Sequence, residues 1–223
     1  MMSKDKVLYA LVASFFLLAS CASKVDTSGE PDVIAMVDPF QVATLGMGLS
    51  DLLGLGMNQT TFDLFFAPRG NATIMAFSYQ MNKTEVFLDY TARQTVIAAV
   101  GTYLEEYEAK TLRTKGKTTA EYGKMQGYME WGVLTKNARA TPEISIGYDF
   151  VKDSPYFTLT VPESTNLIYE GVGGSRVQRS AYMRFYFNRE QAVEFAQHLS
   201  QEFLLEALGE QDVPEASFTP DSY

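Results

Sequence analysis

The sequence predicts an α+β fold in which antiparallel strands form meander sheets and two long amphipathic helices pack against them. Several short segments alternate apolar and polar side chains, as half-buried strands do. Two longer segments repeat apolar residues at helical spacing, and each follows such a strand. The chain also has 13 Tyr and 15 Phe but only 1 Trp, a bias that suits sheets with one covered face.

A helix is predicted over residues 38–54, with Asp38 as N-cap and Pro39 at the first helical position. Apolar residues follow at roughly helical spacing, although interspersed glycines weaken the pattern. The helix either packs in the core or lies on a bilayer surface. Because Asp38 and Asp51 stand where an interfacial helix usually carries Lys or Arg, core packing is favoured.

A meander of three antiparallel strands joined by tight turns is expected next. These strands are expected at residues 61–67, 72–80 and 84–90. A helix over about 92–112 follows, with Thr91 as its cap. Three carboxylates beside its apolar stripe are expected to form a solvated face and not a metal site: Glu105, Glu106 and Glu108.

The second half of the chain repeats this pattern of strands and then a helix. Its strands are predicted at residues 122–134, 143–151, 156–161 and 181–187. Asn188 then caps a second long helix that runs to about Leu208. The chain can therefore be a duplicated unit of β-meander plus helix, with subunits at 61–112 and 120–208, although shared capping chemistry explains the match equally well. This topology resembles the Pur and Whirly single-strand binding architectures, without a shared motif.

The amino terminus has the features of an export signal. Lys4 and Lys6 precede the uncharged apolar run Val7–Leu18, which is short for a membrane span. Next comes Leu18-Ala19-Ser20-Cys21, which resembles the lipobox of bacterial lipoproteins and contains the only cysteine. The resemblance implies that Cys21 receives a diacylglyceryl group and that cleavage occurs before it. The alternative is a plain secretory signal with a chance cysteine.

These features predict a plan for the whole chain. Residues 1–20 are the lipoprotein signal peptide, 21–33 a lipidated flexible tether, 34–208 the α+β domain, and 209–223 a disordered acidic tail. After removal of residues 1–20 the formal charge would be −10. Such a charge is repelled by nucleic acid, so no nucleic-acid partner is expected.

The sequence offers little material for catalysis. His198 is the only histidine and is expected on a solvated helix flank. With His198 on a solvated flank and without another histidine, Ser-His-Asp catalysis and the usual zinc sites have little material, and the lipobox resemblance implies that the Cys21 thiol is occupied by lipid. The glycine clusters lack the spacing of phosphate-binding loops. We therefore expect no cofactor, no metal and no catalytic residues.

A binding surface is predicted in the segment 162–187. Arg176 lies in a Gly-rich connection, and Tyr182, Arg184 and Tyr186 share one face of the following strand. Exposed aromatic and arginine side chains are typical of interface hot spots. The competing interpretation is a mixed solvent face or a layer covered by the second unit.

The predicted function is a non-catalytic binding or structural role in a bacterial cell envelope, with membrane attachment through lipid and an envelope protein as partner. Because Ala22 is not the aspartate that retains lipoproteins at the inner membrane in enteric bacteria, the resemblance implies the outer membrane. Two alternatives remain: a small-ligand-binding lipoprotein that uses a groove between sheet and helices, and an envelope hydrolase built on dispersed carboxylates.

Overall fold

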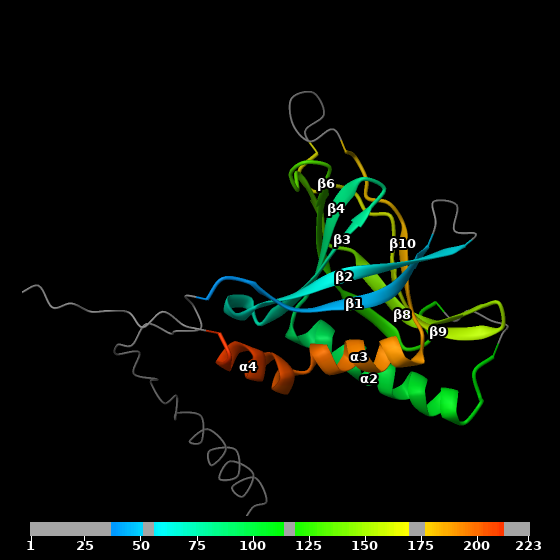
Figure 1. The fold of residues 1–223 in the computed structure, drawn as a ribbon. Coiled ribbons are helices and arrows are strands. Elements are labelled where there is room, and N and C mark those ends of the chain that lie inside the picture. The colour runs from blue at the N-terminus through cyan, green and yellow to red at the C-terminus, as the bar shows by residue number, and fades with distance from the viewer. Residues whose placement is uncertain (1–36, 51–55, 114–118, 170–176, 212–223) are drawn as a thin grey trace, which may run out of the picture. The chain divides into compact units, whose positions relative to one another are not determined.

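A computed structural model describes residues 37–50, 56–113, 119–169 and 177–211. In these residues, ten strands form one antiparallel sheet and three α-helices accompany it (Figure 1), so the predicted α+β class is confirmed. The helices are α2 (Tyr90–Glu108), α3 (Arg189–Leu199) and α4 (Gln201–Gly209). The strands are β1 (Phe40–Ser50), β2 (Met57–Ala67), β3 (Ala72–Tyr79), β4 (Asn82–Leu88), β5 (Gly123–Gln126), β6 (Tyr128–Gly132), β7 (Ala138–Ala140), β8 (Glu143–Val151), β9 (Ser154–Val161) and β10 (Met183–Phe187).

The sheet has the strand order β5-β8-β9-β10-β1-β2-β3-β4-β6-β7. Strands β2, β3 and β4 pair in chain order, which confirms the predicted meander within residues 61–90. Strands β8, β9 and β10 form a second consecutive run, and β10 pairs with β1 to join the two runs. The described residues therefore belong to one compact unit.

The sheet is strongly curled. Strands β3 and β10 are three positions apart in the strand order, about 14 Å in a flat sheet. The rings of Phe77 on β3 and Phe185 on β10 are nevertheless only 5.3 Å apart between centroids and meet edge to face. The curl therefore brings the buried faces of distant strands into direct contact.

The hydrophobic core lies between this curled face and the helices. Helix α2 packs against β8, β5, β4 and β9, while α3 packs against α2 and β1. Aromatic rings dominate the contact with α3, where Phe187 and Phe195 stack at 4.8 Å. Away from these helix contacts, inward residues such as Met75, Phe77 and Trp131 are also almost fully buried.

The connection after β9 crosses to the far edge of the sheet at β7. Asn166, only 3% exposed, donates from Nδ2 to the carbonyl oxygen of Val177 at 2.8 Å and accepts at Oδ1 from the Arg139 N–H at 3.1 Å. The Leu167 N–H also donates to the Arg139 carbonyl oxygen at 2.9 Å. These bonds pair polar groups that a bare sheet edge would leave open.

The helix predicted over 38–54 is wrong, because residues 40–50 form strand β1. The apolar residues Leu45, Met47 and Leu49 alternate toward the core, a period of two that the helical pattern concealed. Gly48 lies between them on the opposite face, where an added Cβ would come within 2.2 Å of Met57 Sδ. Glycine at this position therefore allows close packing in a strand, and the choice between core and interfacial helix no longer applies.

The long helices begin close to the predicted positions but are capped and divided differently. Asp89, not Thr91, caps α2 by accepting from the Ala92 N–H at 2.8 Å. Asn188 caps α3 as predicted, within a capping box. The single helix expected to Leu208 is wrong, because Ser200 leaves helical geometry and caps a separate helix, α4. The predicted tail lies outside the described residues from 212 onward.

The strand predicted over 122–134 is also wrong in detail, because it divides around Gly127 into β5 and β6. In the strand order β5 is the first strand and β6 is the last but one. Strand β7 was not predicted at all. Since β6 pairs with β4, the segments 61–112 and 120–208 contribute interleaved strands to one sheet. Their origin by duplication stays a prediction.

A buried arginine that no sequence pattern indicated fixes the helices against the sheet. Arg93 on α2 is 0% exposed and donates to the Leu199 carbonyl oxygen at 2.9 Å, where α3 ends. It also donates to Gln201 Oε1 at 2.9 Å and to Asn71 Oδ1 at 2.6 Å, in the β2–β3 turn. Burial lowers the pKa of Arg93, while Tyr90 and Asp89 act in the opposite direction. Neutral acceptors at three chain segments thus hold one cation.

We predict that Arg93→Met lowers the free energy of unfolding by about 3 kcal/mol, because hydrogen bonds to a charged group are lost and buried acceptors remain unpaired. Urea unfolding followed by circular dichroism measures the change. Gln94→Met, an exposed substitution on the same helix, is the control and should stay within about 0.5 kcal/mol. Equal stability of the two variants would refute a clamping role for Arg93.

Candidate functional site

The predicted binding residues of β10 lie on the face of the sheet opposite the core. Met183, Phe185 and Phe187 point inward and are at most 2% exposed. Tyr182 and Arg184 alternate with them, as the period of a strand requires. Tyr182 and Arg184 therefore share one face because of the period of the strand. Arg176, the remaining predicted binding residue, lies outside the described residues.

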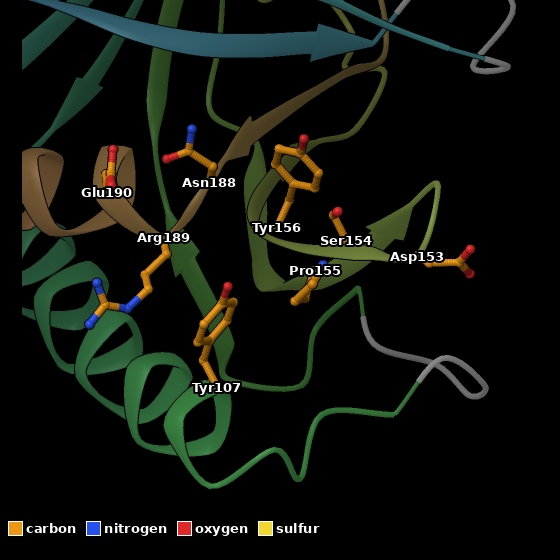
Figure 2. Close-up of a pocket in the computed structure, with 8 residues that line it drawn as sticks. All are labelled: Tyr107, Asp153, Ser154, Pro155, Tyr156, Asn188, Arg189 and Glu190. Carbon is orange, nitrogen blue, oxygen red and sulfur yellow. The ribbon is translucent and has the colours of Figure 1, made fainter.

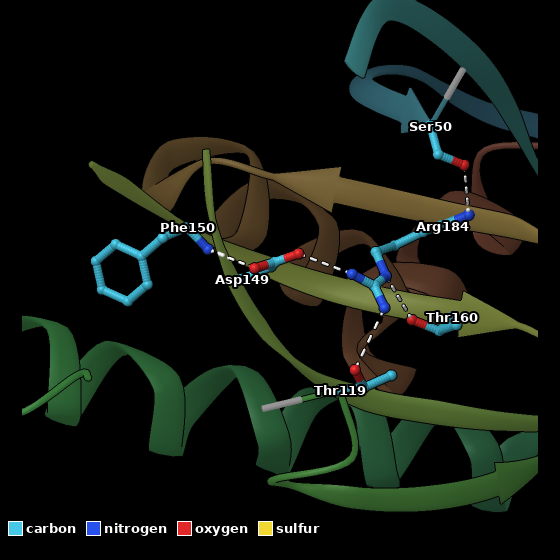
Figure 3. Close-up of polar contacts among 6 residues, drawn as sticks. All are labelled: Ser50, Thr119, Asp149, Phe150, Thr160 and Arg184. Carbon is cyan, nitrogen blue, oxygen red and sulfur yellow. Dashed lines mark hydrogen bonds and ion pairs between the residues drawn. The ribbon is translucent and has the colours of Figure 1, made fainter. Parts of the chain in front are cut away.

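Arg184 is held by a network within its own sheet (Figure 3). Its Nη1 lies 2.7 Å from Asp149 Oδ2 on β8, and its Nε donates to Thr160 Oγ1 on β9 at 3.1 Å. Its Nη2 donates to Thr119 Oγ1 at 3.3 Å, and its backbone N–H donates to Ser50 Oγ at 3.1 Å. The guanidinium thus connects three strands and the segment before β5.

The electrostatic surroundings keep this guanidinium charged. Burial alone would lower the pKa of Arg184, but Tyr182, Tyr186 and Asp149 together raise it above its ordinary value. Burial also raises the pKa of the Tyr186 phenol. A charge-assisted ion pair that also satisfies two hydroxyl groups is rigid, so it fixes the side chains packed around it.

The tyrosines of this face differ in exposure. Tyr182 is 43% exposed, and its ring centroid lies 6.0 Å from the Arg184 guanidinium carbon, within cation–π range. Tyr186 is only 7% exposed and meets the ring of Tyr156 edge to face at 6.2 Å. Tyr182 is therefore the aromatic group that β10 and its flank present to solvent, with Arg184 and Tyr186 as its support.

A cleft adjoins this face at the end of β10 where α3 begins (Figure 2). It has a volume of about 550 Å³ and is formed by the end of α2, the β8–β9 turn and the first residues of α3. Tyr156 belongs both to the cleft and to the aromatic contact with Tyr186. The lining residues are Tyr107, Asp153, Ser154, Pro155, Tyr156, Asn188, Arg189 and Glu190.

The charge of the cleft is set by one paired cation and further carboxylates. Arg189 Nη2 lies 2.6 Å from Glu108 Oε1, and the guanidinium stands 6.0 Å from the Tyr107 ring. The carboxylates of Asp153 and Glu190 also line the cleft. This balance disfavours anionic ligands and suits neutral polar or cationic ones.

The carboxylates of α2 are less uniformly solvated than the sequence suggested. Glu106 accepts from the Tyr122 hydroxyl at 2.6 Å, and Glu108 pairs with Arg189. Burial and the bond to Glu106 raise the pKa of the Tyr122 phenol. Two of the three residues thus hold tertiary contacts, which helical spacing alone does not reveal.

Other chemistry is sparse in the described ranges. There, no group of three or more His, Cys, Asp and Glu side chains is arranged to hold a metal ion. His198 is partly exposed on α3, with Nδ1 2.8 Å from the Glu194 carbonyl oxygen and its ring against Phe203. No helix within the described residues is long and apolar enough to cross a membrane.

Comparison with known proteins gives a family without an assigned activity. A protein of Treponema pallidum (strain Nichols), named only as uncharacterized, is 29% identical over 151 residues, or 66% of this chain. The matched region is 54% of that relative, so the chain spans about half the relative's length. No solved structure matches the chain. A family model described as "Uncharacterised Treponema protein" matches residues 41–206, and the chain therefore belongs to that family.

Proposed function

We propose that this protein is a lipid-anchored component of a bacterial cell envelope that binds an envelope protein through the face of β10. Attachment rests on the lipobox-like run that ends at Cys21. Membership of a family named after a bacterial genus accords with a bacterial lipoprotein. Outer-membrane placement and the absence of a nucleic-acid partner belong to this proposal, supported by Ala22 and by the acidic charge.

The observation that carries the binding role is the support beneath Tyr182. An exposed aromatic ring stands beside a guanidinium fixed by Asp149 and Thr160. Aromatic and arginine residues dominate interface hot spots. Because the supporting network is already formed, binding would require little ordering of these side chains, which favours affinity.

Duplication of a β-meander-plus-helix unit is a further part of the proposal. Its support is local: strand β4 leads through the Asp89 cap into α2, and strand β10 leads through the Asn188 cap into α3. The two strands occupy different places, since β4 lies between β3 and β6 while β10 lies between β9 and β1. A duplication would therefore have been followed by rearrangement of the sheet.

The lipid anchor predicts that Cys21→Ser abolishes metabolic labelling by radioactive palmitate and releases the protein from the membrane fraction. The reason is that several acyl chains, each CH₂ contributing ~0.8 kcal/mol, are what hold a soluble domain at a bilayer. Ser20→Ala, which keeps a small residue before the cysteine, is the matched control and should be labelled normally. Unchanged labelling of Cys21→Ser would disprove acylation at this residue.

The binding face predicts a large effect from one exposed ring. Tyr182→Ala should weaken capture of the crosslinked envelope partner by roughly thirtyfold, the equivalent of about 2 kcal/mol for a hot-spot residue. Quantitative crosslinking in intact cells followed by pull-down measures this. Tyr90→Ala removes a ring of similar exposure, 48%, on α2 and should leave capture unchanged. If both variants capture every partner as the parent does, the face is not the interface.

The cleft favours a second candidate function, binding of a small ligand. It lies between sheet and helices, where a ligand-binding lipoprotein was expected to use a groove, and its volume of about 550 Å³ is that of a small-molecule site. Its hydroxyl, amide and carboxylate groups suit a polar ligand. The hydrolase alternative would draw on the same place, since Asp153 and Glu190 are the carboxylates that line it.

This second candidate predicts a ligand-dependent rise in the thermal midpoint. At a concentration a hundredfold above Kd, a bound ligand stabilises the fold by about 2.7 kcal/mol. Differential scanning fluorimetry against a library of neutral and cationic polar metabolites tests it. Tyr156→Ala should abolish the rise and Tyr90→Ala should preserve it. A rise that persists undiminished in Tyr156→Ala would place the ligand elsewhere.

A further inference from the structure

Exposed apolar side chains gather at one end of the curled sheet. Met81 in the β3–β4 turn and Leu134 in the β6–β7 loop are each 87% exposed, the highest values among the exposed large hydrophobic residues described. Other members are 36–61% exposed. This apolar tip surface consists of Met81, Val133, Leu134, Leu167, Tyr169 and Val177.

The sheet register places these loops together. Lys83 pairs with Gly132, so the turn that contains Met81 lies beside the loop that contains Leu134. The Leu167 N–H bonds to Arg139 on β7, which brings the connection after β9 to the same edge. In Figure 1 the described parts of these three connections lie together at the upper end of the sheet.

Exposed large hydrophobic residues are not distributed evenly over the described part of the molecule. The remaining exposed large hydrophobic residues in the described ranges are scattered over α2, α3, α4 and the flank of β10: Tyr90, Val193, Leu205 and Tyr182. Single exposed apolar residues are ordinary on a soluble protein, whereas a contiguous group marks an interaction site. The apolar tip surface is such a group.

Cationic side chains surround the apolar tip surface. Lys83 is the second residue of β4, Lys136 lies in the β6–β7 loop and pairs with Glu85, and Arg139 is exposed on β7. Arg179 lies in the connection after β9 and pairs with Glu163. With Glu85, Glu163 and Glu130, which lies opposite Arg139 in the sheet, counted against them, these four cations leave a small positive balance at the tip of a chain whose overall formal charge is −9. Apolar side chains bordered by Lys and Arg are the composition of surfaces that enter the headgroup layer of anionic membranes.

The shape favours a bilayer over a protein partner. The side chains project from separate turns, and in one of these Gln80 and Met81 adopt positive φ values of 50° and 65° as the chain reverses. A protein interface requires a matching pocket for each projection and a broad packed area. A lipid layer accepts convex apolar projections without such complementarity.

We propose that the apolar tip surface inserts into the interfacial layer of a bilayer that contains anionic lipids, as a membrane contact separate from the lipid on Cys21. Met81 and Leu134 enter deepest, and Lys83 and Lys136 remain at the headgroups. This contact would orient the domain on the membrane, which a flexible tether alone does not.

Vesicle flotation of residues 22–223 tests this without the anchor, because these residues include the compact unit and its entire core. The parent should float with phosphatidylcholine vesicles that contain about a quarter phosphatidylglycerol. Met81→Asp combined with Leu134→Asp should reduce the bound fraction about tenfold, because two apolar side chains leave the bilayer. The matched control, Val193→Asp with Leu205→Asp, alters exposed residues on α3 and α4 and should float like the parent.

A second measurement uses the lipidated protein in the same vesicles. Leu134→Cys supplies the only free thiol once Cys21 is acylated. The emission of a polarity-sensitive fluorophore attached to it should shift to the blue, whereas the emission of one attached to Val193→Cys should not.

The proposal fails if the parent does not float, if tip and control variants float equally, or if the two fluorophores report the same polarity. Capture of an envelope protein at Leu134 without vesicle binding would make this a protein interface instead. Loss of acylation would leave the flotation result intact, so the two proposals fail separately.

Discussion

One face of a ten-stranded sheet must be removed from water, and two helices cannot cover all of it. Helices α2 and α3 cover the part formed by β1 and by strands around β8 and β9. The remainder is buried because the sheet curls until Phe77 meets Phe185 across three strand positions. The curl also determines what is left outside: the polar face of β8–β10 and the turns at its end.

Arg93 determines where the helices lie on that curled sheet. Its donors reach the end of α3, the start of α4 and the β2–β3 turn, so a change in helix position would leave a buried cation with unpaired donors. The break at Ser200 follows from the same arrangement, because the carbonyl of Leu199 points to Arg93. A buried guanidinium must keep its hydrogen bonds to these neutral acceptors. This requirement favours the observed packing of the helices over similar arrangements in which the bonds would be lost.

The sequence predicts well those elements whose pattern is local. Strands β2, β3, β4, β8 and β9 alternate clearly, and Asn188 carries an unambiguous cap. The prediction from sequence fails at β1. There Leu45 and Leu49 are four residues apart, a spacing that helices and strands both allow, and Gly46 and Gly48 interrupt the pattern between them. Arg93, the Asp149–Arg184 pair and the cleft depend on residues distant in the chain, so no local signal identifies them. The sequence could predict that Tyr182 and Arg184 share a face, because strand periodicity alone determines this.

The placement of the three candidate surfaces gives them a common geometry. Strand β9 has eight residues, so its first and last residues lie about 23 Å apart. One end of β9 continues into the connection that carries Leu167, with Tyr182 nearby just before β10. The other end begins at Ser154 in the cleft.

If the apolar tip surface rests on a bilayer, Tyr182 stands near the membrane and the cleft opens away from it. The stretch from Cys21 to Phe40 can span at most about 65 Å, which exceeds the length of the strands, so a lipid on Cys21 and a membrane contact at the opposite end of β1 are geometrically compatible. A membrane-bound partner would then meet Tyr182, and a soluble ligand would meet the cleft.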